Sequence, residues 1–337
     1  MRHRLERLRE RTNGYTVTPH QYEWTAYVAL GALTVIVLTG AAVRLTGSGL
    51  GCPTWPKCYG NVYPPLNTHA VIEFSNRLIT VPVSLAAGLA WLFALRRRPY
   101  RRDLVWLGAL LPLGVIGQAV LGGFTVRGAL DYGWVMGHFA LSMLLLLAAV
   151  VLAWRASHEP EELPVAGSTD RTLVLSVRGL TVLGAITIFA GTAATAAGPH
   201  AGGSPGQKIN RLDFDGRGTM DFVIHRHAEI AFVFSVAAVV IWWLARRRSA
   251  DAVIRRSLTV LCVLVALQGA VGLDQYETHL PTELVWVHVG LACGAWLAAL
   301  WATCAAGRLE PRGSRISADR RLKGDLGART PVKFPGN

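Results

Sequence analysis

The chain has 337 residues, of which 52% are hydrophobic and only 16% are charged, and its mean hydropathy is +0.35. Soluble domains carry about 25% charged residues, so this composition excludes an ordinary soluble protein and favours a membrane protein. The net charge of +13 comes from basic runs between apolar segments, not from one folded face, which excludes nucleic acid as a partner.

Eight apolar segments are candidates for membrane spans, since about 20 helical residues cross the hydrocarbon core. They predict an all-α membrane protein with spans at 24–43, 69–95, 104–126, 132–154, 179–198, 221–245, 257–273 and 284–307. When these spans alternate in direction, the basic runs all fall on one side, which the positive-inside rule makes cytoplasmic. We therefore expect a multi-pass protein of the cytoplasmic membrane with both termini in the cytoplasm.

Similar residues recur about 150 positions apart, which predicts an internal duplication. His138 and His288 are separated by 150 positions (288 − 138 = 150), and Asn76 precedes His225 by 149 (225 − 76 = 149). Four spans per copy predict two tandem, pseudo-symmetric four-helix bundles. The expected organisation is a cytoplasmic arm, a first bundle with an outer cysteine loop, a linker, a second bundle and a disordered tail, at 1–22, 23–155 (loop 44–68), 156–171, 172–305 and 306–337.

The histidines inside the spans suggest a metal cofactor. His138 and His288 lie about seven residues into their spans, roughly 10 Å from the outer end at 1.5 Å per residue, and Asn76 and His225 lie at similar depth. Facing imidazoles suit the axial ligation of haem iron, whereas zinc would need further ligands at short spacing. We predict His138, His225 and His288 as iron ligands. His227, about 200° from His225 around the helix, is assigned to hydrogen bonding or to a haem propionate.

Two arginines follow the polar positions of the second and sixth spans. Arg77 and Arg226 have two interpretations, which stay open: charge-assisted bonds to haem propionates, or ion pairs with Glu73 and Glu229 on the same helices.

Together these features resemble the haem A synthase family, membrane enzymes that oxidise a methyl group of haem O to the formyl group of haem A through an alcohol. The resemblance rests on "GSGLGCPTWPKC" after the first span, "IEFSNR" in the second, "HR" in the sixth, His138 and His288, and it covers nearly all of residues 20–305. It implies a haem b cofactor on His225 and His288 in the C-terminal bundle. It also implies a site for the substrate haem O in the N-terminal bundle, with His138 and Glu73. The implied partners are membrane lipid, haem O synthase, cytochrome oxidase assembly factors and an electron-transfer partner that the sequence does not identify.

The sequence departs from the family in the second span. The family pattern is Glu-x-x-His-Arg, whereas Asn76 stands here in place of the histidine. Asparagine is a poor iron ligand, so three arrangements stay open for the substrate haem: His138 alone, His138 with water, or His138 with His69, which lies two turns before Asn76 on the same helix face.

The cysteine loop and Glu73 complete the candidate site. Cys52 and Cys58 lie in the predicted outer loop, where an oxidising compartment favours a disulfide. That disulfide has a structural interpretation and, as an alternative, a redox one. Glu73 is predicted to be catalytic, because a nearby carboxylate can accept protons or stabilise a developing cation on the methyl carbon; a structural ion pair with Arg77 is the alternative.

Two other functions would fit parts of this pattern. A b-type cytochrome that exchanges electrons with quinone would explain the histidines but gives no role to Glu73 or to the cysteine loop, and Asn76 breaks its first ligand pair. A transporter is suggested by duplicated bundles, although no span has a Gly or Pro interruption flanked by charges.

Overall fold

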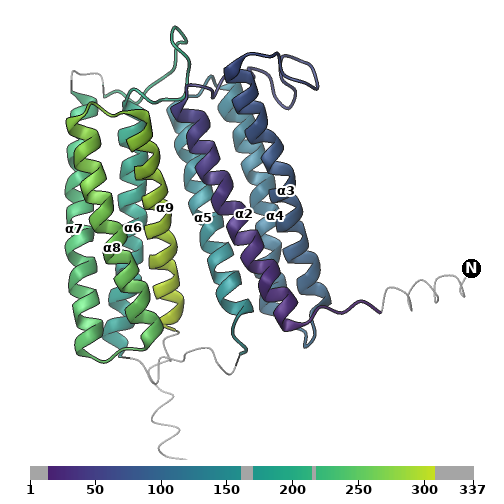
Figure 1. Ribbon diagram of the computed structural model, residues 1–337, viewed down its shortest axis with the longest axis vertical. Helices are drawn as coiled ribbons and strands as arrows, with labels where there is room; N and C mark the ends of the chain where they lie inside the picture. Colours follow the sequence, from purple (N-terminus) through teal and green to yellow (C-terminus); the bar gives the residue numbers. More distant parts are fainter. Residues whose placement is uncertain (1–13, 161–169, 215–217, 308–337) are drawn as a thin grey trace, which may run out of the picture.

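The apolar segments form eight α helices in the computed structural model, which describes residues 14–160, 170–214 and 218–307. The helices are α2 (Pro19–Leu45), α3 (Thr68–Arg96), α4 (Arg102–Arg127), α5 (Tyr132–Ala156), α6 (Arg171–Ala197), α7 (Thr219–Arg247), α8 (Ala252–Glu277) and α9 (Thr282–Ala305) (Figure 1). Each is long and apolar enough to cross a membrane, which confirms the predicted all-α class with eight spans. Residues 1–13 of the predicted arm, 161–169 of the linker and 308–337 of the tail lie outside the described residues.

Side-chain caps determine where most of these helices begin. The first N–H groups of a helix have no partner within it, and a preceding Ser, Thr, Asp or Asn side chain can accept from them. Five of the eight helices begin in this way, after Thr18, Asn67, Asp131, Asp170 and Asp251. Since these caps lie outside the apolar windows, the helices extend beyond the spans that hydropathy predicts.

The helices form two four-membered rings that stand side by side (Figure 1). In the first ring, α2 and α4 each pack against both α3 and α5, and in the second, α6 and α8 each pack against both α7 and α9. The rings meet where α9 packs against α2 and α5, and where α5 packs against α6. Two buried clusters of apolar residues form most of the core; the first is centred in the first ring and includes Cys293, Trp296 and Leu300 of α9, and the second is centred in the second ring and includes Trp154 of α5.

Helix lengths repeat between the two rings. The helices have 27, 29, 26 and 25 residues in the first ring and 27, 29, 26 and 24 in the second. Helix α7 begins 151 positions after α3 (219 − 68 = 151), and α8 begins 150 positions after α4 (252 − 102 = 150). These equal lengths are consistent with the predicted duplication.

The buried residues of α3 and α7 fix the register of that helix pair. They recur at a separation of 151, in the pairs Val83 and Phe234, Ala87 and Ala238, Ala90 and Ile241, Ala94 and Ala245. This register corrects the pairing of Asn76 with His225 that the spacing of 149 predicted. The residue of α7 that corresponds to Asn76 is His227 (227 − 76 = 151), because burial and not the recurrence of a polar residue determines which face of each helix turns inward.

Two tryptophans of α9 join the rings within the apolar region. Trp296 Nε1 donates a hydrogen bond to the Met143 carbonyl of α5 at 3.1 Å, and Trp286 Nε1 donates to the Leu38 carbonyl of α2 at 3.0 Å. These contacts hold the histidine-bearing helix α9 against the first ring.

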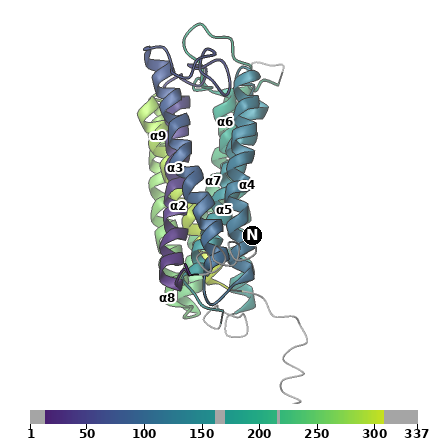
Figure 2. The same cartoon turned by 90° about the vertical axis from the view of Figure 1, so that its right-hand side faces the viewer.

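The long loops 46–67 and 198–214 gather at one end of both rings (Figure 2), which we call the disulfide end. The second loop reaches across to the first: the Gly49 N–H donates to the Gly202 carbonyl at 2.8 Å, and Ser204 Oγ donates to the Gly47 carbonyl at 2.8 Å. A Cβ at Gly47, whose φ is +66°, would lie 2.9 Å from the Gly203 carbonyl oxygen. Glycine therefore allows the two loops to approach this closely.

Candidate functional site

Glu73 and Arg77 of α3 hold the disulfide loop in place. Cys52 and Cys58 form a disulfide, as the sequence predicted. Glu73 Oε2 accepts a hydrogen bond from the Cys52 N–H at 2.7 Å, and Glu73 Oε1 accepts one from Arg77. Arg77 also donates to the carbonyls of Cys52 at 2.9 Å and of Thr54 at 3.0 Å. Both carboxylate oxygens of Glu73 are thus occupied, and the residue is buried, with 6% of its surface exposed.

The disulfide loop brings Trp55 against α4, the helix against which His138 also packs. A Cβ at Gly123 of α4 would lie 3.2 Å from the indole of Trp55, and a Cβ at the adjacent Gly122 would lie 3.5 Å from His138 Cε1. The two glycines therefore allow an indole and an imidazole to pack directly against the α4 backbone. Trp55 and His138 thus both pack on α4, at adjacent residues.

His138 offers a free imidazole in the first ring. Its Nδ1 is buried and has no hydrogen-bond partner among the described residues. Gln118 Nε2 donates to the His138 carbonyl at 3.2 Å and to Ser142 Oγ at 2.8 Å, which fixes the helix turn that carries the ring. A buried and unpaired ring nitrogen is unfavourable unless a ligand engages the imidazole.

In the second ring, His227 and His288 face each other. Their ring centroids are 6.4 Å apart and the rings are inclined by 76°. Each ring lies against a glycine of a neighbouring helix: a Cβ at Gly191 would lie 3.0 Å from His227 Cε1, and a Cβ at Gly272 would lie 3.1 Å from His288 Cε1. The pair is therefore seated between α6 and α8.

The protonation of His227 is set by its hydrogen bond. Its Nδ1 lies 3.1 Å from the Thr187 carbonyl oxygen, which can only accept, so Nδ1 carries the proton and Nε2 presents a lone pair. This is the arrangement in which a histidine binds a metal, because the second nitrogen is oriented by a backbone carbonyl.

The distance between the two rings leaves room for one metal ion between them. With metal–nitrogen bonds of about 2.0 Å, two imidazoles on opposite sides of one ion have ring centres about 6 Å apart, close to the observed 6.4 Å. The described residues contain no group of three or more His, Cys, Asp and Glu side chains able to hold a metal ion. The candidate ligands are thus the His227–His288 pair and His138.

The structure does not bring His225 to His288. His225 is exposed, its Nδ1 donates to the Asp221 carbonyl of its own helix at 2.7 Å, and its ring lies 6.3 Å from that of Tyr276. Sequence reasoning missed His227 as the residue that faces His288; it lies one turn after Val223, on the face of α7 that carries the buried Val223, Phe234, Ala238, Ile241 and Ala245.

The two charged pairs predicted from the sequence differ in their surroundings. Arg226 pairs with Glu229 at 2.7 Å, and both side chains are more than half exposed. Arg77 pairs with Glu73 in a largely buried position. Each arginine therefore forms the ion pair with the glutamate of its own helix.

The remaining predicted residues also have defined partners. Asn76 Oδ1 accepts a hydrogen bond from Thr39 Oγ1 of α2 at 2.8 Å. His69 Nδ1 lies 3.0 Å from Ser48 Oγ, in the loop above the ring. Since seven residues of helix span about 10 Å, His69 lies well above the level of Asn76.

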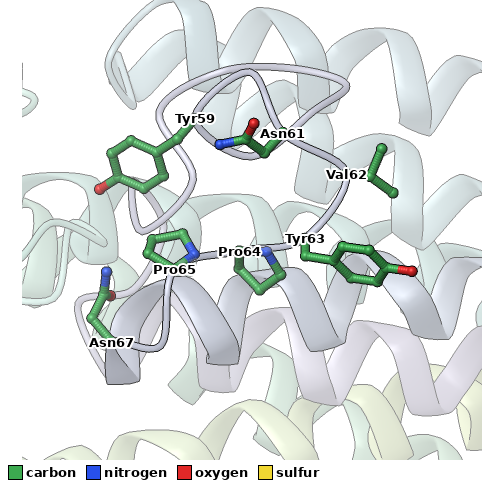
Figure 3. Close-up of a pocket in the computed structure, with 7 residues that line it drawn as sticks. All are labelled: Tyr59, Asn61, Val62, Tyr63, Pro64, Pro65 and Asn67. Carbon is green, nitrogen blue, oxygen red and sulfur yellow. The ribbon is translucent and has the colours of Figure 1, made fainter.

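A surface pocket lies in the part of loop 46–67 that follows the disulfide (Figure 3). It is lined by Tyr59, Asn61, Val62, Tyr63, Pro64, Pro65 and Asn67. None of the candidate iron ligands lines this pocket, so it is separate from the histidine sites.

Comparison with known proteins identifies the family. A family model described as cytochrome oxidase assembly protein matches residues 23–71 and 66–300. The chain is similar to the Heme A synthase of Shewanella oneidensis, with 25% identity over 316 residues, which cover 80% of this chain and 92% of that protein.

Two shorter matches have higher identity. The Heme A synthase of Lysinibacillus sphaericus is 34% identical over 134 residues, which cover 39% of this chain and 43% of that protein. That of Shouchella clausii is 38% identical over 136 residues, which cover 39% and 44%. The chain thus spans less than half the length of these two relatives. Because the family model covers most of the chain, the protein belongs to the cytochrome oxidase assembly family that includes the haem A synthases.

Proposed function

We propose that this protein is a haem A synthase, which oxidises a methyl group of haem O to the formyl group of haem A through an alcohol. The observation that carries the proposal is the difference between the two histidine sites. The second ring has two facing imidazoles, His227 and His288, whereas the first has His138 and an asparagine. Two facing imidazoles suit the ligands of a resident haem iron, whereas the first ring offers one imidazole, that of His138, to a substrate haem.

The residues of the second ring fit a haem b. His227 Nε2 is available as a ligand because the Nδ1 proton of the same ring is bonded to the Thr187 carbonyl. The His288 ring lies 6.4 Å away between centroids, which leaves room for one iron. Haem b, when bound, supplies one-electron redox chemistry. His225, the ligand expected from the sequence, would have to leave its exposed position to take part.

In the first ring, we propose that Glu73 and Arg77 act through the loop that they anchor. Together they fix the backbone of residues 52–54, which in turn positions Trp55 beside the helix that carries the His138 seat. A loop held in this way excludes water from the reacting methyl group. Each Glu73 oxygen keeps a lone pair beyond the bond to Cys52 or Arg77, so direct proton acceptance by Glu73 is the alternative role.

The distribution of basic residues supports an orientation in the membrane. The ends of the rings opposite the disulfide end carry most of the described arginines, including Arg96–Arg98, Arg101, Arg102, Arg155 and Arg246–Arg248. By the positive-inside rule, that end is cytoplasmic and the disulfide end faces outward. The histidine sites then lie in the outer leaflet of the cytoplasmic membrane, within reach of haem O dissolved in lipid. Haem O synthase, cytochrome oxidase assembly factors and an electron-transfer partner are the proteins that such an enzyme would meet.

The test is the pigment of the purified protein and the products in its membranes. Haem b together with haem O or haem A, and loss of haem A from membranes of cells that lack the protein, would support the enzyme. Haem b alone, with haem A formation unchanged, would instead support a b-type cytochrome, for which the facing histidine pair would suffice.

A further inference from the structure

The two rings differ at one glycine that faces the interior. The buried residues of α2 recur in α6 at a separation of 151, in the pairs Tyr22 and Leu173, Ala26 and Val177, Ala29 and Leu180, Leu33 and Gly184. By this register Gly191, which supports the ring of His227 in the second half, corresponds to Gly40 in the first (191 − 40 = 151). The two positions can therefore be compared directly.

At Gly40 there is open space where the second ring has an imidazole. A Cβ at Gly191 would lie 3.0 Å from His227, whereas a Cβ at Gly40 would meet no atom within 4 Å. Gly40 lies seven residues, or two turns, beyond the buried Leu33 and so on the same inward face. Asn76 takes the place of His227 in the register and has a shorter side chain, which leaves this space unfilled.

The amide of Asn76 has a defined orientation beside this space. Thr39 Oγ1 donates to Asn76 Oδ1 at 2.8 Å, and the residue that corresponds to Thr39 in the second ring is Ala190, which has no hydroxyl. The bond directs Oδ1 toward α2 and leaves Asn76 Nδ2, a donor with two protons, without a partner in the described parts of the chain. The first ring thus has the hydrogen-bonded pair Thr39 and Asn76 at the positions where the second ring has Ala190 and His227.

We infer that the first ring has a binding site for one small neutral iron ligand, of the size of water or a diatomic gas. The site lies over Gly40, on the side of the substrate haem opposite His138, and Asn76 Nδ2 donates a hydrogen bond to the ligand. This inference rests on the proposed function, because it takes the iron to be that of a haem bound at His138. The position opposite His138 follows from the registers: Asn76 corresponds to His227 and His138 to His288, and the latter pair face each other.

His69 is not a competing ligand at this site. It lies about 10 Å nearer the disulfide end than Asn76, and its Nδ1 is engaged with Ser48 Oγ at 3.0 Å. Its ring would have to leave that contact and descend two turns to reach the space over Gly40.

The experiment uses the full-length protein in detergent, supplied with protohaem and reduced, with carbon monoxide as the probe. The haem b held by two histidines has no free position, so we expect one carbon monoxide per protein, bound at the first ring. Asn76→His should fill the space, give a second low-spin haem and reduce carbon monoxide binding at least tenfold. Asn76→Leu should keep the binding but raise the C–O stretching frequency in the infrared, because the hydrogen-bond donor is lost.

A pair of glycine variants separates the site from general effects on the helix. Gly40→Val should abolish carbon monoxide binding because it fills the space, whereas Gly31→Val, at an exposed and equally open position of α2, should leave it unchanged. A second haem that binds no carbon monoxide, or equal binding in Gly40→Val and wild type, would overturn this inference and leave the proposed function intact. A preparation that takes up only one haem per protein, held by the two histidines of the second ring, would contradict the proposed function and, with it, this site.

Discussion

Glu73 Oε2 accepts a hydrogen bond from the Cys52 N–H at 2.7 Å, so a carboxylate on the membrane-length helix α3 holds the first residue of the disulfide loop in place. Carboxylates buried in an apolar environment require such partners. Glu73 has two, since its other oxygen accepts from Arg77. This arrangement changes what a substitution of Glu73 is expected to do.

Glu73→Gln and Glu73→Ala should behave differently. A glutamine can still accept from the Cys52 N–H, so we expect this variant to make haem A within about tenfold of wild type, a change of about 1.4 kcal/mol. Alanine leaves the buried Cys52 N–H without an acceptor, which costs about 1–3 kcal/mol, and removes the carboxylate partner of Arg77, so the loop should open. The measurement is the ratio of haem O, alcohol and haem A in membranes, with thermal unfolding alongside. Equal loss of haem A in both variants would show that the carboxylate itself takes part in the reaction.

His227→Ala should remove the low-spin haem b, whereas His225→Ala should retain it. The reason is that His227 faces His288 at 6.4 Å, while His225 is exposed and bonded to its own helix. The absorbance spectrum of the purified, reduced protein measures the outcome, and His288→Ala is the positive control. Loss of haem b from the His225 variant alone would restore the pairing that the sequence spacing suggested.

Gly272→Val should lower the haem b content of the second ring. Even a Cβ at this position would lie 3.1 Å from His288 Cε1, so the larger side chain must displace the imidazole. Gly269→Val is the matched control, because a Cβ at Gly269 of the same helix meets nothing within 4 Å. Haem per protein, determined by the pyridine haemochrome, should fall only in the first variant. Similar haem contents in the Gly272 and Gly269 variants would mean that a larger side chain at Gly272 does not displace the His288 ring.

Cys52→Ser with Cys58→Ser should destabilise the disulfide loop without unfolding the helices. Removing a disulfide that closes a short loop costs about 2 kcal/mol, and both cysteines are fully buried. We expect a lower midpoint of thermal unfolding and faster proteolysis within residues 52–58, with haem b retained. Mass spectrometry of the unreduced wild-type protein provides the control, since it should detect the peptides of Cys52 and Cys58 linked. Free thiols in freshly isolated membranes would contradict the bond.

The number and class of the helices could be predicted from the sequence, but not the register between the two halves. An apolar window of span length has few alternatives to a helix, so eight spans follow from composition and length. The register is harder to predict, because α7 carries histidines at both 225 and 227. Their spacings from Asn76, 149 and 151, are equally close to the repeat of 150. Only burial, at Val223, Phe234 and Ala238, distinguishes the two faces.

The anchoring of the loop could not be predicted from local patterns. A spacing of four residues is enough to suggest an ion pair between Glu73 and Arg77. The contacts of that pair with Cys52 and Thr54 join residues more than twenty positions apart through backbone atoms, which have no signature in the sequence. The same holds for Trp55 and Gly123, which meet only because the loop folds back over α4.

The crossing of loop 198–214 onto the first ring has a consequence for how the molecule could be divided. Each ring closes on itself, so a chain cut between α5 and α6 would yield two polypeptides with a bundle apiece. The two fragments would still meet away from the cut, where the Gly49 N–H donates to the Gly202 carbonyl and Ser204 Oγ donates to the Gly47 carbonyl. Co-expressed fragments would therefore keep a backbone contact through which the two bundles recognise each other.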